Sequence, residues 1–235
     1  MTVSVRRVTD PADPALVAFG HLQEAVYYQP EMLIPASYFG QMIAGQAGRR
    51  NVILVAEQGG EVVGGTLFHL LVAAAFSSFM GVSRSARGSG AARVLHQARL
   101  DIVRGAGGAG VFADAVHVSA LNVEELAAEE KVGSDPTQRR LKLGGLGFFT
   151  VDAPYWQPVG GPDGGPLTDL DLLYCPLEPG KTVALSLVTR TLETYWQGWL
   201  GPERAALEAQ ALAERTGHDP VDLLSADQRP RAFAV

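Results

Sequence analysis

A short turn rich in small residues constrains the fold of this chain more than any other feature of the sequence. It runs from Val82 to Ala92 with the sequence VSRSARGSGAA. The residues before it, about 74–82, have the pattern of a strand, and apolar positions recur at helical spacing over about 89–104. A strand that passes through a glycine turn into an amphipathic helix predicts a layered fold of strands and helices.

The helix after this turn has an apolar stripe, and we expect that stripe to be its buried face. The stripe consists of Ala91, Val94, Leu95, Ala98 and Ile102. Charged and polar residues, with His96 among them, lie between these positions and are expected to face solvent. Glycines at 105, 107, 108 and 110 end the helix.

The rest of the chain also alternates between strand and helix patterns. Gly59-Gly60 lies between two runs of β-forming residues and predicts a tight hairpin. Further strands are expected near 3–8, 111–116, 148–154 and 169–175, and helices near 14–28, after Pro35, and over 137–143, 185–199 and 202–216. We predict an α+β domain over 1–179, with 180–235 as a C-terminal helical extension packed on it.

The start of the helix over 89–104 has the properties of an anion site. The first amides of a helix have no intrahelical acceptor, and the helix dipole gives that end a positive partial charge. Small residues at 88, 90, 91 and 92 allow a ligand to approach the backbone, and Arg84 and Arg87 add formal charge. The turn therefore suits a pyrophosphate group.

Spacing separates three kinds of phosphate-binding turn. A P-loop needs Lys-Ser/Thr directly after its last glycine, and this turn lacks that pair. A dinucleotide fingerprint that starts at Gly88 would place Arg93 where a small residue must pack. The pattern Arg/Gln-x-x-Gly-x-Gly/Ala remains, and Arg87, Gly90 and Ala92 satisfy it.

This pattern resembles the acyl-CoA-binding motif of the GNAT superfamily of N-acetyltransferases. The order of elements over residues 3–176 is similar to that family, and so is Leu146-Gly147-Phe148 before the sixth strand. The resemblance implies a twisted mixed sheet flanked by helices, whose fourth and fifth strands splay apart. It also implies transfer of an acetyl group from acetyl-CoA to a small primary amine by direct attack.

The same resemblance suggests which residues bind the cosubstrate. The backbone of Met80 and Val82 would pair with the pantetheine arm, and the turn after them would bind the pyrophosphate. The implied cofactor-binding residues are Met80, Val82, Arg84, Arg87, Gly88, Ser89, Gly90, Ala91 and Ala92. The acceptor pocket would be built from variable segments, here 14–45 and 157–167, so the identity of the amine stays open.

Two positions depart from the family pattern. The tyrosine that many members use as general acid is replaced by Leu143, and Ser77 and Ser78 stand in the fourth strand, where a glutamate often serves as base. A hydrocarbon side chain cannot donate a proton, so the acid and base must come from elsewhere or from ordered water. The alternative is a non-catalytic acyl-CoA-binding module, a sensor or regulator with the same fold.

Three residues are candidates for the missing catalytic groups. His117 follows the fifth strand and titrates near neutrality, which suits proton transfer. Asn122 resembles an asparagine found after the fifth strand in relatives, although a capping role explains it equally well. Tyr155 begins a glycine-proline loop and is either a general acid or a packing residue. Asp114 is expected on the opposite strand face from His117.

Composition limits the partners of this chain. Its 235 residues carry a formal net charge of -6, so a nucleic-acid backbone would be repelled. A single cysteine and the lack of any Cys/His cluster predict no disulfide and no metal site. No run reaches the roughly 18 apolar residues of a membrane span. We expect a cytoplasmic protein. The Trp196/Trp199 pair could form an oligomer contact, so a homodimer is possible.

Overall fold

The computed structural model describes residues 2–29, 32–45, 50–160 and 164–233. It divides into two compact units. The N-terminal unit comprises residues 1–70, 77–106 and 122–135, and the C-terminal unit comprises 71–76, 107–121 and 136–235. Strand β4 (Ala75–Val82) begins in the C-terminal unit and continues into the N-terminal one. Within the described residues, no helix is both long and apolar enough to span a membrane.

The N-terminal unit is built on strands in the order β1-β2-β3-β4. Strands β1 (Ser4–Val8), β2 (Arg50–Gln58) and β3 (Glu61–Leu70) pair antiparallel. Gly59 and Gly60 have φ values of 63° and 88°, which confirms the predicted tight hairpin between β2 and β3. Residues 52–56 of β2 are all buried, because helices cover both faces of this strand.

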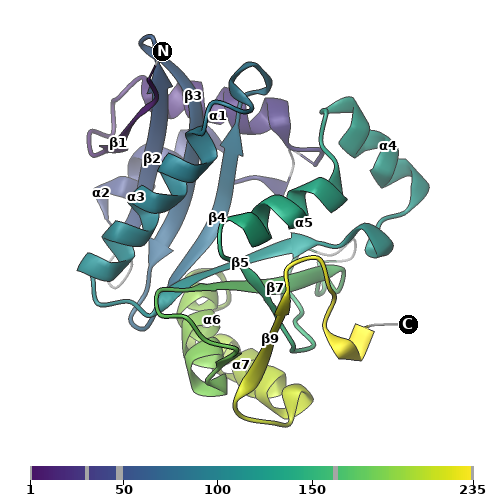
Figure 1. Ribbon diagram of the computed structural model, residues 1–235. Coiled ribbons are helices and arrows are strands. Elements are labelled where there is room, and N and C mark those ends of the chain that lie inside the picture. The colour runs from purple at the N-terminus through teal and green to yellow at the C-terminus, as the bar shows by residue number, and fades with distance from the viewer. Residues whose placement is uncertain (1, 30–31, 46–49, 161–163, 234–235) are drawn as a thin grey trace. The chain divides into compact units, whose positions relative to one another are not determined.

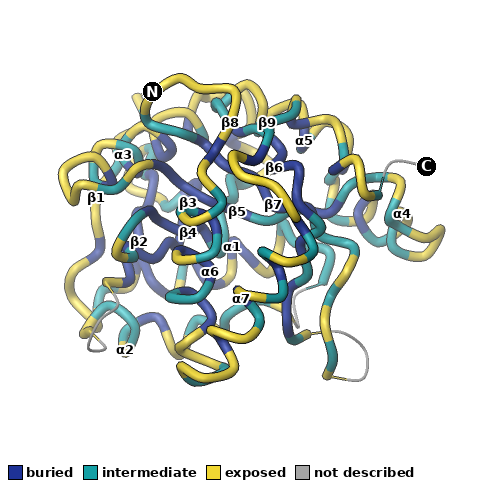
Figure 2. Tube along the Cα trace, turned by 90° about the horizontal axis from the view of Figure 1, so that it is seen from below, coloured by how far each residue is buried: buried dark blue, intermediate teal, exposed yellow. Residues whose placement is uncertain are grey.

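Helices α1 (Ala15–Val26) and α2 (Phe39–Ala44) cover one face of these strands, and α3 (Ala91–Gly105) covers the other (Figure 1). Phe19 of α1 stacks on Phe39 of α2 with ring centroids 5.4 Å apart. Gly65 of β3 makes this packing possible, because a Cβ there would lie 2.4 Å from a ring carbon of Phe19. Helix α4 (Val123–Lys131) completes the unit, and most of its residues are exposed or half-buried (Figure 2).

The predicted buried face of α3 is partly wrong. Its buried residues are Ala91, Leu95, His96, Arg99 and Val103, whereas Val94 is 39% exposed. A buried arginine is stable here because its guanidinium donates to Ser77 Oγ at 2.5 Å and lies 2.6 Å from His96 Nδ1. Polar residues that hydrogen-bond to one another can therefore occupy the buried face of an amphipathic helix.

The C-terminal unit has strands in the order β5-β7-β6-β9-β8, and each neighbouring pair is antiparallel. They are β5 (Gly110–Val116), β6 (Phe149–Val151), β7 (Leu170–Pro176), β8 (Thr182–Val183) and β9 (Val221–Ser225). Helices α6 (Leu185–Leu200) and α7 (Pro202–Thr216) confirm the two helices predicted after residue 180. Strands β8 and β9 were not predicted.

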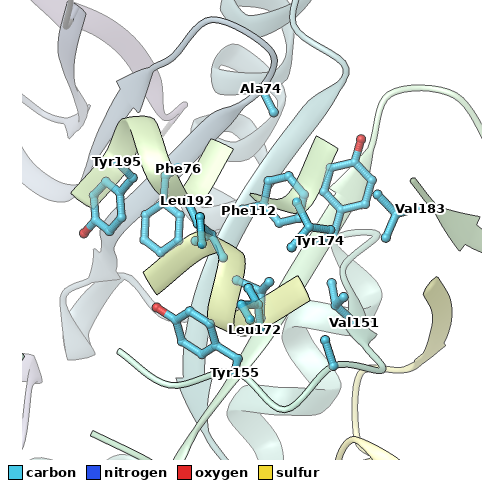
Figure 3. Close-up of a cluster of buried hydrophobic side chains, with 14 of the residues drawn as sticks. Ala74, Phe76, Phe112, Val151, Tyr155, Leu172, Tyr174, Val183, Leu192 and Tyr195 are labelled. Atoms are coloured by element: carbon cyan, nitrogen blue, oxygen red, sulfur yellow. The ribbon is translucent and has the colours of Figure 1, made fainter. Parts of the chain in front are cut away.

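The core of the C-terminal unit lies between its sheet and the α6–α7 pair (Figure 3). Phe76 stacks on Tyr195 of α6 at 3.8 Å between ring centroids, and Phe112 of β5 stacks on Tyr174 of β7 at 4.3 Å. Trp196 is 1% exposed, so it belongs to this core and not to the surface.

The other face of this sheet carries a buried ionic network around Arg140 of α5 (Pro136–Gly145). Because side chains alternate along β7, Asp171 points away from Leu172 and Tyr174 and receives Arg140 at 3.1 Å. Arg140 also donates to the carbonyls of Ala115, Ala226 and Gln228. One side chain thus connects β5, β7 and the segment after β9.

Candidate active site

The predicted anion site is a turn between β4 and α3 in the N-terminal unit. A short 3-10 helix, Arg84–Ala86, follows β4, and α3 begins at Ala91 with Gly90 as its N-cap. Gly88 and Gly90 have φ values of 83° and 87°, in the left-handed region that favours glycine. A Cβ at either glycine would meet no atom of the described residues within 4 Å, so these residues leave the space beside both glycines open.

Several backbone amides of this turn have no partner in the part of the chain that the structure describes. Ser89 N donates to Ala86 O, and Ala91 N donates to Ser89 Oγ. The amides of Gly88, Gly90 and Ala92 have no acceptor among the residues that the structure describes. Three donors at the positive end of a helix of 15 residues form a site that suits an anion.

Arg84 and Arg87 contact the end of α4 within the same unit. Arg84 donates from Nε to Val132 O at 3.0 Å and from Nη2 to Lys131 O at 2.6 Å. Arg87 Nη1 donates to Gly133 O at 2.5 Å. The carbonyls at a helix C-terminus have a negative partial charge, so the guanidinium groups of both arginines stabilise that end of α4. Their hydrogen bonds also connect α4 to the turn.

Met80 and Val82 lie near the end of β4 and are half-buried. Ser83 N donates to Val63 O at 2.8 Å, so the backbone of Ser83 faces β3. Backbone groups of successive strand residues point to alternate sides. The amides and carbonyls of Met80 and Val82 therefore point away from β3, as pairing with a ligand would require.

His117 lies in the C-terminal unit, just after β5, with both ring nitrogens engaged. Nδ1 accepts from Ser119 N at 3.2 Å, and Nε2 lies 3.1 Å from Asp227 O. A carbonyl can only accept, so Nε2 is the donor in the contact with Asp227 O. His117 thus connects the end of β5 to the segment after β9.

Asn122 lies in the N-terminal unit and is the N-cap of α4. Its side chain accepts from Glu125 N at 2.9 Å, and the Glu125 side chain accepts from Asn122 N at 2.9 Å. This reciprocal pair is a capping box. The geometry accounts for Asn122 by helix capping alone.

We expect Asn122→Ala to lower the free energy of unfolding of the N-terminal unit by about 1 kcal/mol, because it removes the cap of α4. Asn122→Ser should recover most of this loss, since a hydroxyl also caps well. Urea unfolding of both variants measures the effect. A change in kcat without a change in stability would instead point to a role in catalysis.

Tyr155 is fully buried in the C-terminal unit, yet its hydroxyl meets polar groups. The hydroxyl oxygen lies 3.0 Å from Asp114 Oδ2 and 2.7 Å from Gln157 Oε1. Gln157 Oε1 also accepts from Trp196 Nε1 at 3.2 Å. Burial, followed by the charge of Asp114, holds the pKa of Tyr155 well above its usual range.

Asp114 is the polar residue that the sequence prediction left without a role. It lies on β5 between the buried side chains of Phe112 and Val116, on the same strand face. Burial raises the pKa of its carboxyl to about 6. The signal in the sequence was a single carboxylate within an otherwise apolar strand.

The two positions that depart from the family pattern carry no phenol and no carboxylate. Leu143 is half-buried near the end of α5. Ser77 Oγ receives Arg99, and Ser78 Oγ lies 2.7 Å from His69 Nε2. Both serines therefore serve hydrogen bonds inside the N-terminal unit.

A groove of about 460 Å³ lies elsewhere, beside β8 and β9. It is lined by Lys181, Asp222, Leu223, Leu224, Gln228, Arg229 and Arg231. No predicted site residue is among them. Arg231 is paired with Asp152 and Asp222, and Arg229 with Asp171, so ion pairs within the chain already occupy these arginines.

Comparison with known structures confirms the predicted fold class, a twisted mixed sheet flanked by helices. A GNAT-family structure from Desulfovibrio desulfuricans matches with a TM-score of 0.50 at 16% identity, over 75% of this chain and 100% of that one. An aminoglycoside 6'-N-acetyltransferase complexed with coenzyme A matches with a TM-score of 0.51 at 17% identity, over 77% of this chain and 99% of that one. A search of curated proteins finds no match.

The sequence itself matches a family model. The model is that of the acetyltransferase (GNAT) family, and it matches residues 17–144. That range includes β4, the glycine turn, α3 and β5. Enzymes of this family are acyltransferases that use acetyl-CoA. The chain therefore belongs to the acetyltransferase (GNAT) family.

Proposed function

We propose that this chain transfers the acetyl group of acetyl-CoA to a small primary amine by direct attack. The observation that carries the proposal is the set of amides at Gly88, Gly90 and Ala92, which have no acceptor among the described residues, with open space left by those residues beside the two glycines. Membership of the acetyltransferase family supports the same cosubstrate. A structure of similar fold is complexed with coenzyme A.

In this proposal the turn from Arg87 to Ala92 binds the pyrophosphate. The amides donate to phosphate oxygens, and the dipole of α3 stabilises their charge. Arg87 uses one nitrogen for Gly133 O, and its other nitrogens have no acceptor among the described residues, so they can reach an anion. Arg84 acts mainly through α4, because its Nε and Nη2 already donate there.

Met80 and Val82 complete the cosubstrate site in this proposal. Their backbone groups point away from β3 and would pair with the amides of the pantetheine arm. Such pairing uses main-chain hydrogen bonds, as when a peptide adds to a strand edge. It would orient the thioester for attack without a specific side chain.

The reaction requires a neutral amine. The acceptor nitrogen attacks the thioester carbonyl carbon, a C–N bond forms, the C–S bond breaks, and coenzyme A leaves as its thiol. Positioning two reactants contributes much of the rate in such a transfer. Removal of a proton from the acceptor ammonium contributes the rest.

Two measurements test this function. Isothermal titration calorimetry should show binding of acetyl-CoA, and free thiol should appear with at least one member of a panel of primary amines. Absence of binding would contradict the proposal. Binding without thiol release across the panel would favour the acyl-CoA-binding module that we considered as the alternative.

Three further expectations stay predictions. They are the domain boundary at residue 179, a cytoplasmic location and a homodimer. The acceptor segments 14–45 and 157–167 also stay predictions, and residues 30–31 and 161–163 within them lie outside the described residues.

A further inference from the structure

Three polar side chains form a hydrogen-bonded line across the sheet of the N-terminal unit. They are Asn51 on β2, His69 on β3 and Ser78 on β4, and these strands are neighbours in the sheet (Figure 1). His69 Nδ1 lies 2.6 Å from Asn51 Oδ1, and His69 Nε2 lies 2.7 Å from Ser78 Oγ. His69 is 2% exposed and Asn51 is buried, whereas Ser78 is half-buried. Of the three residues, Ser78 is therefore the one that a substrate can reach.

The hydrogen bonds of Asn51 fix which nitrogen of His69 can accept a proton. Asn51 Nδ2 donates to Met42 O at 2.9 Å, so the Asn51 atom that faces His69 is the acceptor Oδ1. His69 Nδ1 is therefore the donor in the contact with Asn51. In the neutral imidazole Nε2 then carries no hydrogen, and it accepts from the Ser78 hydroxyl. The neutral ring thus presents its basic nitrogen to Ser78.

This arrangement joins a hydroxyl, a base and a group that orients the base. A serine hydroxyl is not a base by itself, but a hydroxyl bonded to an imidazole can take up a proton while it passes its own to Nε2. Asn51 holds the ring in the orientation that this transfer needs, which is the task of the third residue in a catalytic triad. The three side chains can therefore act as a proton relay that begins at Ser78.

Strand β4 also brings Ser78 close to the proposed cosubstrate site. In that proposal the turn after β4 binds the pyrophosphate, and Val82 and Met80 pair with the pantetheine arm. The thioester is at the far end of the arm, so it lies further back along β4, toward Ser78. Ser78 precedes Met80 by two residues, which is about 7 Å along a strand. These residues all belong to the N-terminal unit, as Asn51 and His69 do.

We propose that Ser78 takes the proton of the acceptor ammonium and passes its own proton to His69, which acts through Ser78. This inference rests on the proposed function. One proton moves from the ammonium to the Ser78 oxygen, while the Ser78 hydrogen moves to His69 Nε2. The neutral nitrogen attacks the thioester carbonyl carbon, the C–N bond forms, the C–S bond breaks, and the second proton goes to the departing thiolate. His69 returns its proton through Ser78 to water, so the products are the amide, coenzyme A thiol and one proton.

Substitutions at Ser78 and His69 test the relay by thiol release, with acetyl-CoA and the most reactive primary amine of the panel. Ser78→Ala removes the hydroxyl, and His69→Gln keeps a polar group that cannot take up a proton. Each should lower kcat by about 10²- to 10⁴-fold, the usual contribution of a general base. The double variant should be no slower than the slower single variant, because residues that act as a unit are not additive. Ser78→Thr keeps a hydroxyl and should restore kcat to within about tenfold of the wild type.

Ser77→Ala is the matched control, because it removes a hydroxyl from the neighbouring residue of the same strand. Ser77 Oγ accepts from Arg99 and takes no part in the contact between Ser78 and His69. This variant should lose stability and keep kcat within about twofold of the wild type. All variants should keep their affinity for acetyl-CoA in calorimetry and their circular dichroism spectrum. The Ser78 variants carry the test even where the buried substitution His69→Gln prevents folding.

Three results would overturn the relay. One is wild-type kcat in Ser78→Ala, and another is a pair of single losses that multiply in the double variant. The third is an acetyl group on Ser78, found by mass spectrometry after incubation with acetyl-CoA alone, since Ser78 would then be a nucleophile. Failure of the wild type to bind acetyl-CoA or release thiol would overturn the proposed function instead.

Discussion

Gly90→Val should lower the affinity for acetyl-CoA by at least about 100-fold. Gly90 has a φ of 87°, which a β-branched residue adopts only with strain, so the backbone must move and the adjacent amides with it. The added methyl groups would also enter the open space beside the turn. Charge-assisted hydrogen bonds contribute roughly 1.5–3 kcal/mol each, and about 1.4 kcal/mol corresponds to a tenfold change. Calorimetry measures the affinity directly.

Gly107→Val is the matched control for this variant. Gly107 follows α3, has a φ of 76°, and a Cβ there would also meet no atom within 4 Å. Both variants should therefore lose a similar amount of stability, roughly 1–2 kcal/mol, from the left-handed backbone alone. Only Gly90→Val should lose affinity. Wild-type affinity in Gly90→Val would show that the turn does not bind the cosubstrate.

Arg140→Ala should lower the free energy of unfolding of the C-terminal unit by about 3–5 kcal/mol. Arg140 is 1% exposed, and its guanidinium contacts Asp171, Thr150 and three backbone carbonyls. Its removal leaves the fully buried Asp171 carboxylate with Arg229, at 3.2 Å, as its remaining ion-pair partner among the described residues. Loss of one member of a buried pair costs this much because the other charge stays desolvated. Urea unfolding measures the change.

Arg204→Ala on α7 is the control for Arg140→Ala. The Arg204 side chain is 55% exposed and lies 3.7 Å from Glu208. An exposed pair of this kind contributes little, so its loss should change stability by less than about 0.5 kcal/mol. Equal and small effects of both substitutions would contradict the structural role of Arg140. Asp171→Leu added to Arg140→Met should restore part of the stability, because it removes the isolated charge.

Local patterns in the sequence determined most of the elements of this fold. Gly59-Gly60 specified a hairpin because two adjacent residues must take positive φ. The apolar spacing after residue 184 specified the two helices α6 and α7, which are separated by Gly201, and α7 begins at Pro202. The glycines before α3 specified an exposed helix start, because the conformation that they adopt is a property of the residues themselves.

Contacts between residues far apart in the sequence were decided only by the tertiary structure. The N–H groups of Arg84 and Arg87 can donate to a phosphate or to a carbonyl equally well. The tertiary structure places the carbonyls at the end of α4 within hydrogen-bond distance of both side chains. The periodicity of α3 could not reveal that Arg99 is buried, since this depends on Ser77, 22 residues away. Strand β9 carries a short apolar pattern that only its pairing with β6 identifies as a strand.

The candidate site shows the same division. The anion-binding turn is contiguous in sequence, so local conformation and the helix dipole were enough to predict it. The hydrogen bond between Asp114 and Tyr155 joins residues 41 positions apart. The pKa of the Asp114 carboxyl depends on its burial and on the groups that the fold places around it. Backbone conformation is local, whereas desolvation and side-chain pairing are set by the folded surroundings.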